Sequence, residues 1–157
     1  MNWFINNRDF IKNLAINTGT SSSPTFTTMC TTSEINIDTD LETKDFYVWC
    51  DALQRRITTG ASVTLSGTVK IDVNNDAVMG LLDNVHTLIA DGEIAQFNNL
   101  LIQFDLLTGV SNSVLEYTTY QVPVNLTLSD LGGSAEDEGE FGFEMPFNGK
   151  GTVVTSS

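Results

Sequence analysis

The sequence is poor in the residue types from which most catalytic and metal-binding sites are built. It contains one histidine and two cysteines. Any triad or zinc site would have to use His86, and Cys30 and Cys50 do not stand at metal-ligand spacing. No Gly-x-Ser-x-Gly turn and no phosphate-binding glycine loop occurs. The sequence therefore predicts that the protein is not an enzyme and has no catalytic residues, no metal site and no cofactor.

Basic residues are also scarce, with 7 Lys plus Arg against 20 Asp plus Glu and a net charge of −13. Specific binding of DNA requires cations that replace the counterions of its phosphates. Docking on an anionic membrane surface likewise requires basic segments. We expect neither, whereas the same charge favours solubility and repulsion from other polyanions.

Long apolar runs are missing as well. No stretch approaches the roughly 18 uninterrupted apolar residues of a membrane-spanning helix. The start, MNWFINNRDFIKNL, is interrupted by Asn, Arg, Asp and Lys and does not read as a signal peptide. The two cysteines could pair, but two cysteines in a chain of this size are more often free thiols in a reducing cytoplasm. With 41% hydrophobic residues, we expect one soluble, globular domain over residues 1–157, made in the cytoplasm.

Alternation of apolar and polar residues dominates what is present. In SVTLSGTVKID, residues 62–72, Val63, Leu65, Val69 and Ile71 share one face. The same alternation occurs in QVPVNLTL (121–128), EFGFEMPF (140–147) and the more apolar LLIQFDLL (100–107). Such patterns are typical of half-buried antiparallel strands. Gly67 interrupts the apolar face, which indicates a bulge or the close approach of another backbone.

One stretch has a helical period instead. NNDAVMGLLDNVHTLIADGE places apolar residues at helical spacing, with Asp72, Asn74 or Asn75 as a possible N-cap and Gly92 as a C-cap. We therefore predict a mainly β fold, an antiparallel β-sandwich with one flanking α-helix at about residues 74–91. A long loop and terminal arms complete it.

Those additional segments carry large apolar groups without an evident place in the core. Residues 39–60 are too long for an ordinary hairpin connection and are expected to form a long loop. Residues 1–8 form an N-terminal arm, and residues 148–157 form a C-terminal segment. The aromatic side chains of the loop and arm either fold back on their own sandwich or dock on neighbouring subunits.

The stretch GGSAEDEGEFGFEMPFNGKG, residues 132–151, has five carboxylates before its first basic residue. It lacks the ligand spacing of a helix-loop-helix calcium site. A solvated hairpin turn that leads into a strand is the favoured interpretation, and metal binding comes second.

The order of these parts resembles the major tail proteins, or tail tube proteins, of long-tailed bacteriophages. An N-terminal strand, RDFIKNLAI, precedes the Thr-rich SPTFTTMCTTSEINID and the charged, aromatic LETKDFYVW. ITTGASVTLSGTVKID then leads directly into the helix that begins NNDAVMGLL. The chain closes on the acidic turn and a last hairpin, AEDEGEFGFEMPFNGKGTVVT. The runs TGASVTLSG at 59–67 and FNGKGTV at 147–153 are the most specific pieces.

The resemblance implies a structural virion protein whose six-membered rings stack into a tail tube, the conduit for DNA ejection into the host. The 39–60 loop and the chain ends would contact neighbouring subunits, and double-stranded DNA would pass through an acidic lumen without specific binding. The implied inter-subunit residues are Trp3, Phe4, Phe46, Tyr47, Trp49, Leu53, Arg55 and Arg56. The lumen-facing candidates are Thr64, Ser66, Gln103, Asp105, Glu140 and Glu144.

The implied partners are further copies of the chain in a homo-hexamer, the tail tip or baseplate, the tape measure and the terminator, with no membrane. The implied location is the virion tail, after synthesis in the cytoplasm of the bacterial host. A tail completion or joining protein and a contractile-type inner tube protein remain alternatives that share this plan. A carbohydrate-binding β-sandwich is a more distant alternative, and it would tolerate the monomeric state.

Overall fold

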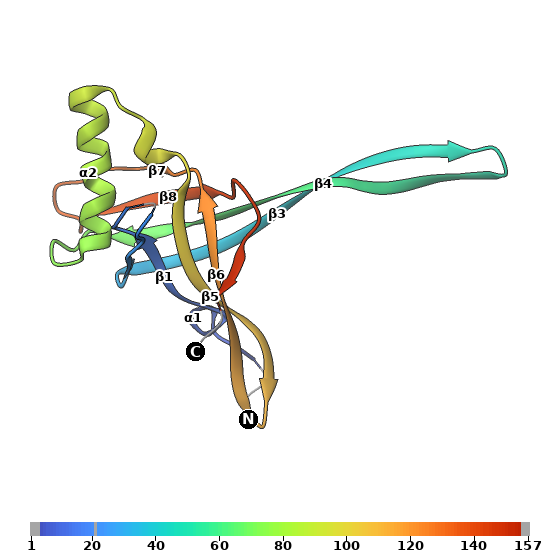
Figure 1. Cartoon of the computed structure of the whole chain (residues 1–157), viewed down its shortest axis with the longest axis horizontal. Coiled ribbons are helices and arrows are strands. Elements are labelled where there is room, and N and C mark those ends of the chain that lie inside the picture. Colours follow the sequence, from blue (N-terminus) through green and yellow to red (C-terminus); the bar gives the residue numbers. More distant parts are fainter. Residues whose placement is uncertain (1–3, 21, 155–157) are drawn as a thin grey trace.

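Two antiparallel sheets pack face to face in the computed structural model, which describes residues 4–20 and 22–154 (Figure 1). One sheet has the strand order β2-β1-β5-β6-β9, and the other has the order β3-β4-β8-β7. The first sheet contains β1 (Ile11–Asn17), β2 (Phe26–Thr28), β5 (Leu100–Ser111), β6 (Val114–Val124) and β9 (Thr152–Val154). The second contains β3 (Thr32–Val48), β4 (Asp51–Lys70), β7 (Thr127–Ser129) and β8 (Glu140–Pro146). The helices are α1 (Asn7–Phe10), α2 (Asp76–Asp91) and the 3-10 turn η1 (Ala95–Phe97). The predicted sandwich with one flanking helix is confirmed.

The core lies between the inner faces of the two sheets. The four-stranded sheet contributes Leu65, Val69, Phe141, Phe143 and Met145, and the five-stranded sheet contributes Ile102, Phe104, Val122 and Val124, all of them buried. Burial of each such side chain stabilises the fold by about 1.5–3 kcal/mol relative to leaving it exposed. The strand residues between them point outward, as the alternation in the sequence predicted.

Gly67 lets the backbone of β3 and a core ring approach β4 closely. It pairs with Phe143 of β8 and with Ile35 of β3. A Cβ atom at this position would lie 2.0 Å from the carbonyl oxygen of Glu34 and 2.9 Å from the Cζ atom of Phe143. The predicted close approach is therefore confirmed, and no larger residue fits here without a shift of the backbone.

The helix α2 begins at Asp76 and carries both predicted caps. The side chain of Asn75 accepts hydrogen bonds from the N–H groups of Ala77 and Val78, and its Nδ2 donates to the Thr28 carbonyl at 3.1 Å. Gly92 ends the helix in the left-handed conformation, with φ of 68°. Ala77, Val78 and Leu81 enter the core. Within the described part of the chain, no helix has the length and apolar character needed to cross a membrane.

The expected loop at residues 39–60 is instead the outer part of a long β-hairpin. Strands β3 and β4 stay paired from Thr32↔Val69 to Val48↔Asp51 and run far beyond β8 (Figure 1). Alternation did not reveal these strands because neither face of the hairpin is covered, so almost every described side chain between residues 38 and 60 is exposed. A strand without a buried face has no apolar period to detect.

Two further differences concern the ends of strands. QVPVNLTL is not one strand, since β6 ends at Val124 and β7 begins at Thr127 in the other sheet. Pro123 therefore lies next to the end of β6, where its missing N–H interrupts the strand pairing least. The segment RDFIKNLAI begins as the short helix α1, and β1 starts only at Ile11.

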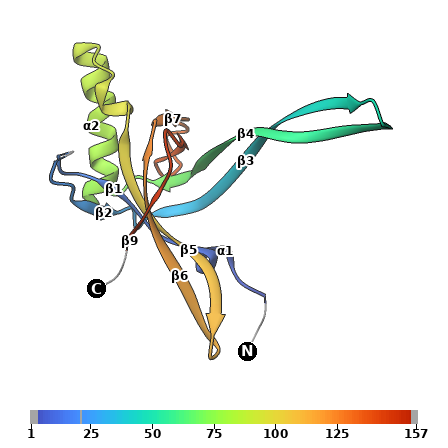
Figure 2. The same cartoon turned by 45° about the vertical axis from the view of Figure 1, so that its right-hand side comes forward.

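A second hairpin, which the sequence did not indicate, is formed by β5 and β6. It projects past the sandwich in a different direction from the β3–β4 hairpin (Figure 2). Its turn residues, Asn112 and Ser113, both have positive φ, which is typical of a tight two-residue hairpin turn.

Substitution of Gly67 tests the close packing of β3, β4 and β8. Gly67→Ala should lower the free energy of unfolding by at least about 2 kcal/mol, because the new methyl group would overlap the Glu34 carbonyl. Denaturant titration measures the change. Gly60→Ala is the matched control, since its nearest neighbour would be Glu42 Oε2 at 3.7 Å, and it should alter stability by less than about 0.5 kcal/mol. Equal effects of the two substitutions would contradict this account.

Candidate assembly surfaces

The outer face of the four-stranded sheet collects acidic side chains. Strand pairing places Ser66 beside Glu144, and Lys70 beside Glu140. On the other side, the same strand places Thr64 beside Asp38. The exposed carboxylates that project from this face are Glu34, Asp38, Asp40, Glu140 and Glu144, with serine and threonine between them. Four predicted lumen residues, Thr64, Ser66, Glu140 and Glu144, therefore lie together on one surface.

The cation Lys70 on this face is already paired. Its Nζ donates a hydrogen bond to Glu138 Oε2 at 2.6 Å. This hydrogen bond, with the attraction between the two charges, raises the pKa of Lys70 and lowers the pKa of Glu138. Glu138 belongs to the acidic turn, so one carboxylate of that turn serves as a partner of β4. The charge of the face remains strongly negative.

The other two lumen candidates, Gln103 and Asp105, lie on the opposite side of the molecule. They project from the outer face of the five-stranded sheet, where they are half-buried. Asp105 accepts hydrogen bonds from Thr119 Oγ1 at 2.5 Å and Asn13 Nδ2 at 2.8 Å. Gln103 accepts one from Gln121 Nε2 at 3.0 Å. The predicted set is thus divided between two faces that point in opposite directions, and a single channel wall cannot contain both groups.

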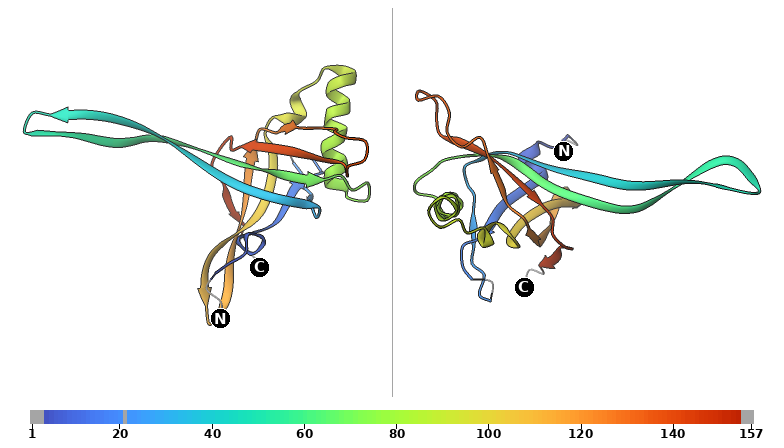
Figure 3. Two further views of the ribbon diagram at one scale, coloured as in Figure 1. Left: turned by 180° about the vertical axis from the view of Figure 1, so that it is seen from behind. Right: turned by 90° about the horizontal axis from the view of Figure 1, so that it is seen from above.

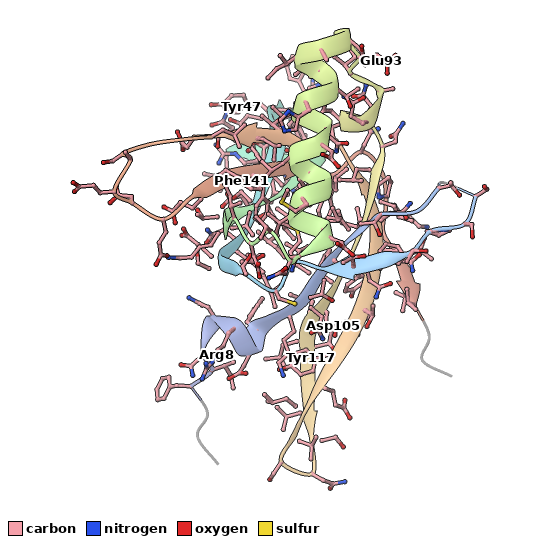
Figure 4. The ribbon with its side chains drawn as sticks, turned by 90° about the vertical axis from the view of Figure 1, so that its left-hand side faces the viewer. Arg8, Tyr47, Glu93, Asp105, Tyr117 and Phe141 are labelled. Atoms are coloured by element: carbon pink, nitrogen blue, oxygen red, sulfur yellow. The ribbon has the colours of Figure 1, made fainter. Side chains whose placement is uncertain are left out.

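The outer five-stranded face is less acidic than its counterpart. The Lys12 Nζ atom lies 4.6 Å from the centre of the Tyr117 ring, an arrangement that favours the cation. Tyr117 also donates a hydrogen bond to the Asp9 carbonyl at 2.5 Å, which ties α1 to β6. Figure 4 shows Asp105 and Tyr117 along the same ribbon pair.

The β3–β4 hairpin exposes apolar side chains at its far end. Trp49 in the turn is fully exposed, and Tyr47 and Leu53 are about 70% exposed (69% and 73%). Phe46 is half-buried and pairs with Arg55 across the ribbon. A two-stranded ribbon is at best marginally stable in water on its own. The tip therefore has the composition of a protein–protein interaction surface.

An ion pair links the two strands below this tip. The Nε atom of Arg56 donates to Asp45 Oδ1 at 2.7 Å, and Nη2 approaches Oδ2 at 3.4 Å. The hydrogen bond from Arg56 and its positive charge lower the pKa of Asp45. Arg56 was predicted to lie at an interface, and in the single chain its guanidinium already has a partner.

The remaining predicted interface residues lie at the N-terminus. Phe4 is 88% exposed, whereas Trp3 lies outside the described residues. Both cysteines are free thiols, with Cys50 in the hairpin turn and Cys30 just before β3. Within the described residues, no three His, Cys, Asp or Glu side chains converge as metal ligands would.

Glu34, Asp38 and Asp40 were not among the predicted lumen residues, although they extend the acidic face. Their signal was present in SEINIDTD, where acids and Asn36 alternate with Ile35 and Ile37. That alternation identified exposed positions. The sequence alone could not show that these positions border Thr64 and Ser66.

Comparisons of sequence identify no relative: no protein-family model matches this chain, and no curated protein matches it. Comparison of structure finds chains that share its fold. A chain from the tail of an empty gene transfer agent particle, refined with C6 symmetry, has a TM-score of 0.60 and 18% identity, with 97% of this chain and 100% of that one covered. This chain and that one share a fold along nearly their whole length. A chain from the virion of a native gene transfer agent particle has a TM-score of 0.58, again at 18% identity, with 97% of this chain and 100% of that one covered.

A further match comes from an extracellular contractile injection system. A chain of its sheath–tube complex in the extended state has a TM-score of 0.57 and 12% identity, with 97% of this chain and 93% of that one covered. At these identities the shared property is the fold. The coverage includes nearly all of both chains, so the projecting hairpins are compared as well as the sandwich.

The pKa of Asp45 tests the ion pair in the hairpin. It should lie below the ordinary aspartate value and rise toward that value in Arg56→Gln, because the substitution removes the hydrogen bond and the charge. The folded-state pKa is the lowered one, so the stabilisation is present above the unfolded-state pKa and is lost as pH falls through the folded value. Carboxyl chemical shifts followed by NMR report it. Lys70→Gln is the control, since it should shift Glu138 and leave Asp45 unchanged. An Asp45 pKa insensitive to Arg56→Gln would refute the pairing.

Proposed function

We propose that the chain is a structural, non-enzymatic virion protein that assembles as stacked hexameric rings into a tail tube for DNA ejection. The observation that carries the proposal is a fold shared along nearly the whole chain with a component of a C6-symmetric tail. The exposed hairpin tip supports it, because Trp49 and Tyr47 lack cover in a single copy. The tail tip or baseplate, the tape measure and the terminator are the further partners in this proposal.

The four-stranded sheet is the better candidate for the channel wall. Its outer face carries the exposed carboxylates Glu34, Asp38, Asp40, Glu140 and Glu144. On the opposite face, the carboxylate oxygens of Asp105 already accept hydrogen bonds from Thr119 and Asn13. Free carboxylates repel phosphates within a Debye length of about 8–10 Å. A wall of this kind lets DNA pass without binding it. Gln103 and Asp105 then belong to the outside of the tube.

A contractile-type inner tube is a second form of the same function. The match to the sheath–tube complex, at a TM-score of 0.57, favours it. In that case a sheath protein would surround the tube. A joining protein, which forms a single ring, is distinguished by its failure to polymerise.

Negative-stain electron microscopy of the purified, concentrated protein tests the proposal directly. Long hollow tubes or stacked rings, alone or after seeding with a purified tail tip, are the expected result. Single rings under both conditions would indicate a joining protein. Monomers that persist even with the seed would refute the tube proposal and favour the carbohydrate-binding alternative.

Trp49→Ala tests whether the indole at the hairpin tip contributes to assembly and not to the stability of the monomer. Trp49→Ala should leave the free energy of unfolding of the monomer within about 0.5 kcal/mol of the original, because the side chain is fully exposed. It should raise the critical concentration for assembly by about tenfold or more, since desolvated aromatics often dominate interfaces. Light scattering against concentration measures this. Val73→Ala, which also truncates an exposed apolar side chain (73%), should change neither quantity.

Charge changes on the outer faces of the two sheets identify which sheet forms the channel wall. Glu144→Lys changes the net charge of each chain by +2, as does the pair Gln103→Lys and Gln121→Lys on the opposite face. Both proteins should form tubes. Short DNA should become nuclease-resistant with Glu144→Lys tubes, because the new cations face the lumen, and should stay nuclease-sensitive with the control. Protection by the control alone would place the five-stranded sheet inside.

A further inference from the structure

The segment between β8 and β9, residues 147–151, connects the two sheets of the sandwich. The N–H of Phe147 donates a hydrogen bond to the Val63 carbonyl of β4 at 2.8 Å. The N–H of Asn148 donates one to the Pro123 carbonyl of β6, also at 2.8 Å. Figures 1 and 3 show the segment in red as it passes from β8 to β9. Its path is therefore fixed by contacts with both sheets.

Asn148 is followed by Gly149, and this is the one Asn-Gly step in the sequence. The amide carbon of an asparagine side chain can be attacked by the backbone nitrogen of the next residue, because the bond between them closes a five-membered ring. A side chain on that next residue hinders the attack, and glycine has none. Asparagine is accordingly one of the thermolabile residue types.

The local structure leaves the attacking nitrogen accessible. Asn148 and Gly149 are both exposed and lie outside the helices and strands. Among the hydrogen bonds of the described residues, none is donated by the N–H of Gly149. Water can therefore take the proton from this nitrogen without competing with a contact inside the protein.

One contact restrains the side chain that would be attacked. Asn148 Nδ2 donates a hydrogen bond to Asn99 Oδ1. Asn99 is held in turn, because its N–H donates to Asn125 Oδ1 at 3.2 Å. The restraint is a single hydrogen bond between exposed groups, and such a bond contributes little net free energy. It slows the rotation of the Asn148 side chain and does not prevent it.

We propose that Asn148 is a site of spontaneous deamidation, with water as the co-reactant. The Gly149 nitrogen gives up its proton and forms a bond to Asn148 Cγ. The Cγ–Nδ2 bond breaks, and the side-chain nitrogen takes up a proton and leaves as ammonia. Water then opens the succinimide at one of its two carbonyls, which gives either aspartate or isoaspartate. No atom is oxidised or reduced, and the reaction does not depend on the assembly proposed above.

The two products differ in their effect on the segment. Aspartate keeps the length of the main chain, and Asn99 can rotate its amide so that Nδ2 donates to the new carboxylate. Isoaspartate routes the main chain through the former side chain and lengthens it by one methylene. The segment has no slack for this, since even a Cβ atom at Gly151 would lie 3.0 Å from Val122 Cγ2. Isoaspartate at this position therefore loosens β9, which pairs only with β6 among the described strands.

Incubation of the purified full chain at mildly alkaline pH tests the assignment, because the attacking nitrogen then loses its proton more readily. Cleavage after glutamate places Asn112 and Asn148 on separate peptides, since Glu116 and Glu144 lie between them. Mass spectrometry then measures the acid formed at each. Asn148 should convert at least about tenfold faster than Asn112, which is also exposed but precedes Ser113, whose side chain hinders the attack. Conversion at Asn148 no faster than at Asn112 would overturn the proposal.

Hydrogen exchange on the same samples tests the structural consequence. After incubation, the amides of β9 should exchange at least about fivefold faster than before, because its pairing with β6 opens more often. Asn148→Gln, incubated in the same way, should keep its original exchange, since its longer side chain would have to close a less favourable six-membered ring. Freshly prepared Asn148→Asp should also exchange slowly, because it has the charge without the longer main chain. Faster exchange in either variant, or none in the incubated original, would contradict the assigned effect of isoaspartate.

Discussion

Burial of one face of each strand is the constraint on which the rest of this structure depends. Because side chains alternate along a strand, the register that sends Leu65 and Val69 into the core also sends Ser66 outward beside Glu144. A slip by one residue would exchange the two faces. Gly67 prevents such a slip in β4, since only a glycine fits beneath the Glu34 carbonyl and the Phe143 ring. Packing of the core and concentration of acids on one outer surface are therefore consequences of the same pairing.

The features that could be predicted from the sequence are those with a local physical signal. Helix α2 was recognisable because its period, its Asn75 cap and the left-handed Gly92 all lie within one short stretch. Strands with one buried face, such as the one around Phe141 and Phe143, were recognisable from alternation. Four of the six lumen candidates lie together on one face because they come from two strands that pair directly.

The features that could not be predicted depend on pairing between distant segments or on surfaces that one copy does not bury. Strands β3 and β4 continue to Val48 and Asp51 because their backbones pair with each other, and no apolar period marks those residues. Gln103 and Asp105 are also outward-facing polar residues, and alternation alone assigns no residue to one sheet or the other. Assignment to a sheet requires the strand order, which a single sequence does not contain.

The β3–β4 hairpin extends away from the side of the subunit on which α2 lies (Figures 1 and 3), and this has a consequence for any polymer in which the hairpin tip binds another copy. Such a polymer has a direction, because every subunit donates on one side and accepts on the other. One end then displays uncovered Trp49 side chains, and the other displays the surface that receives them. The two ends are chemically different surfaces, so elongation and termination at each would require different binding proteins.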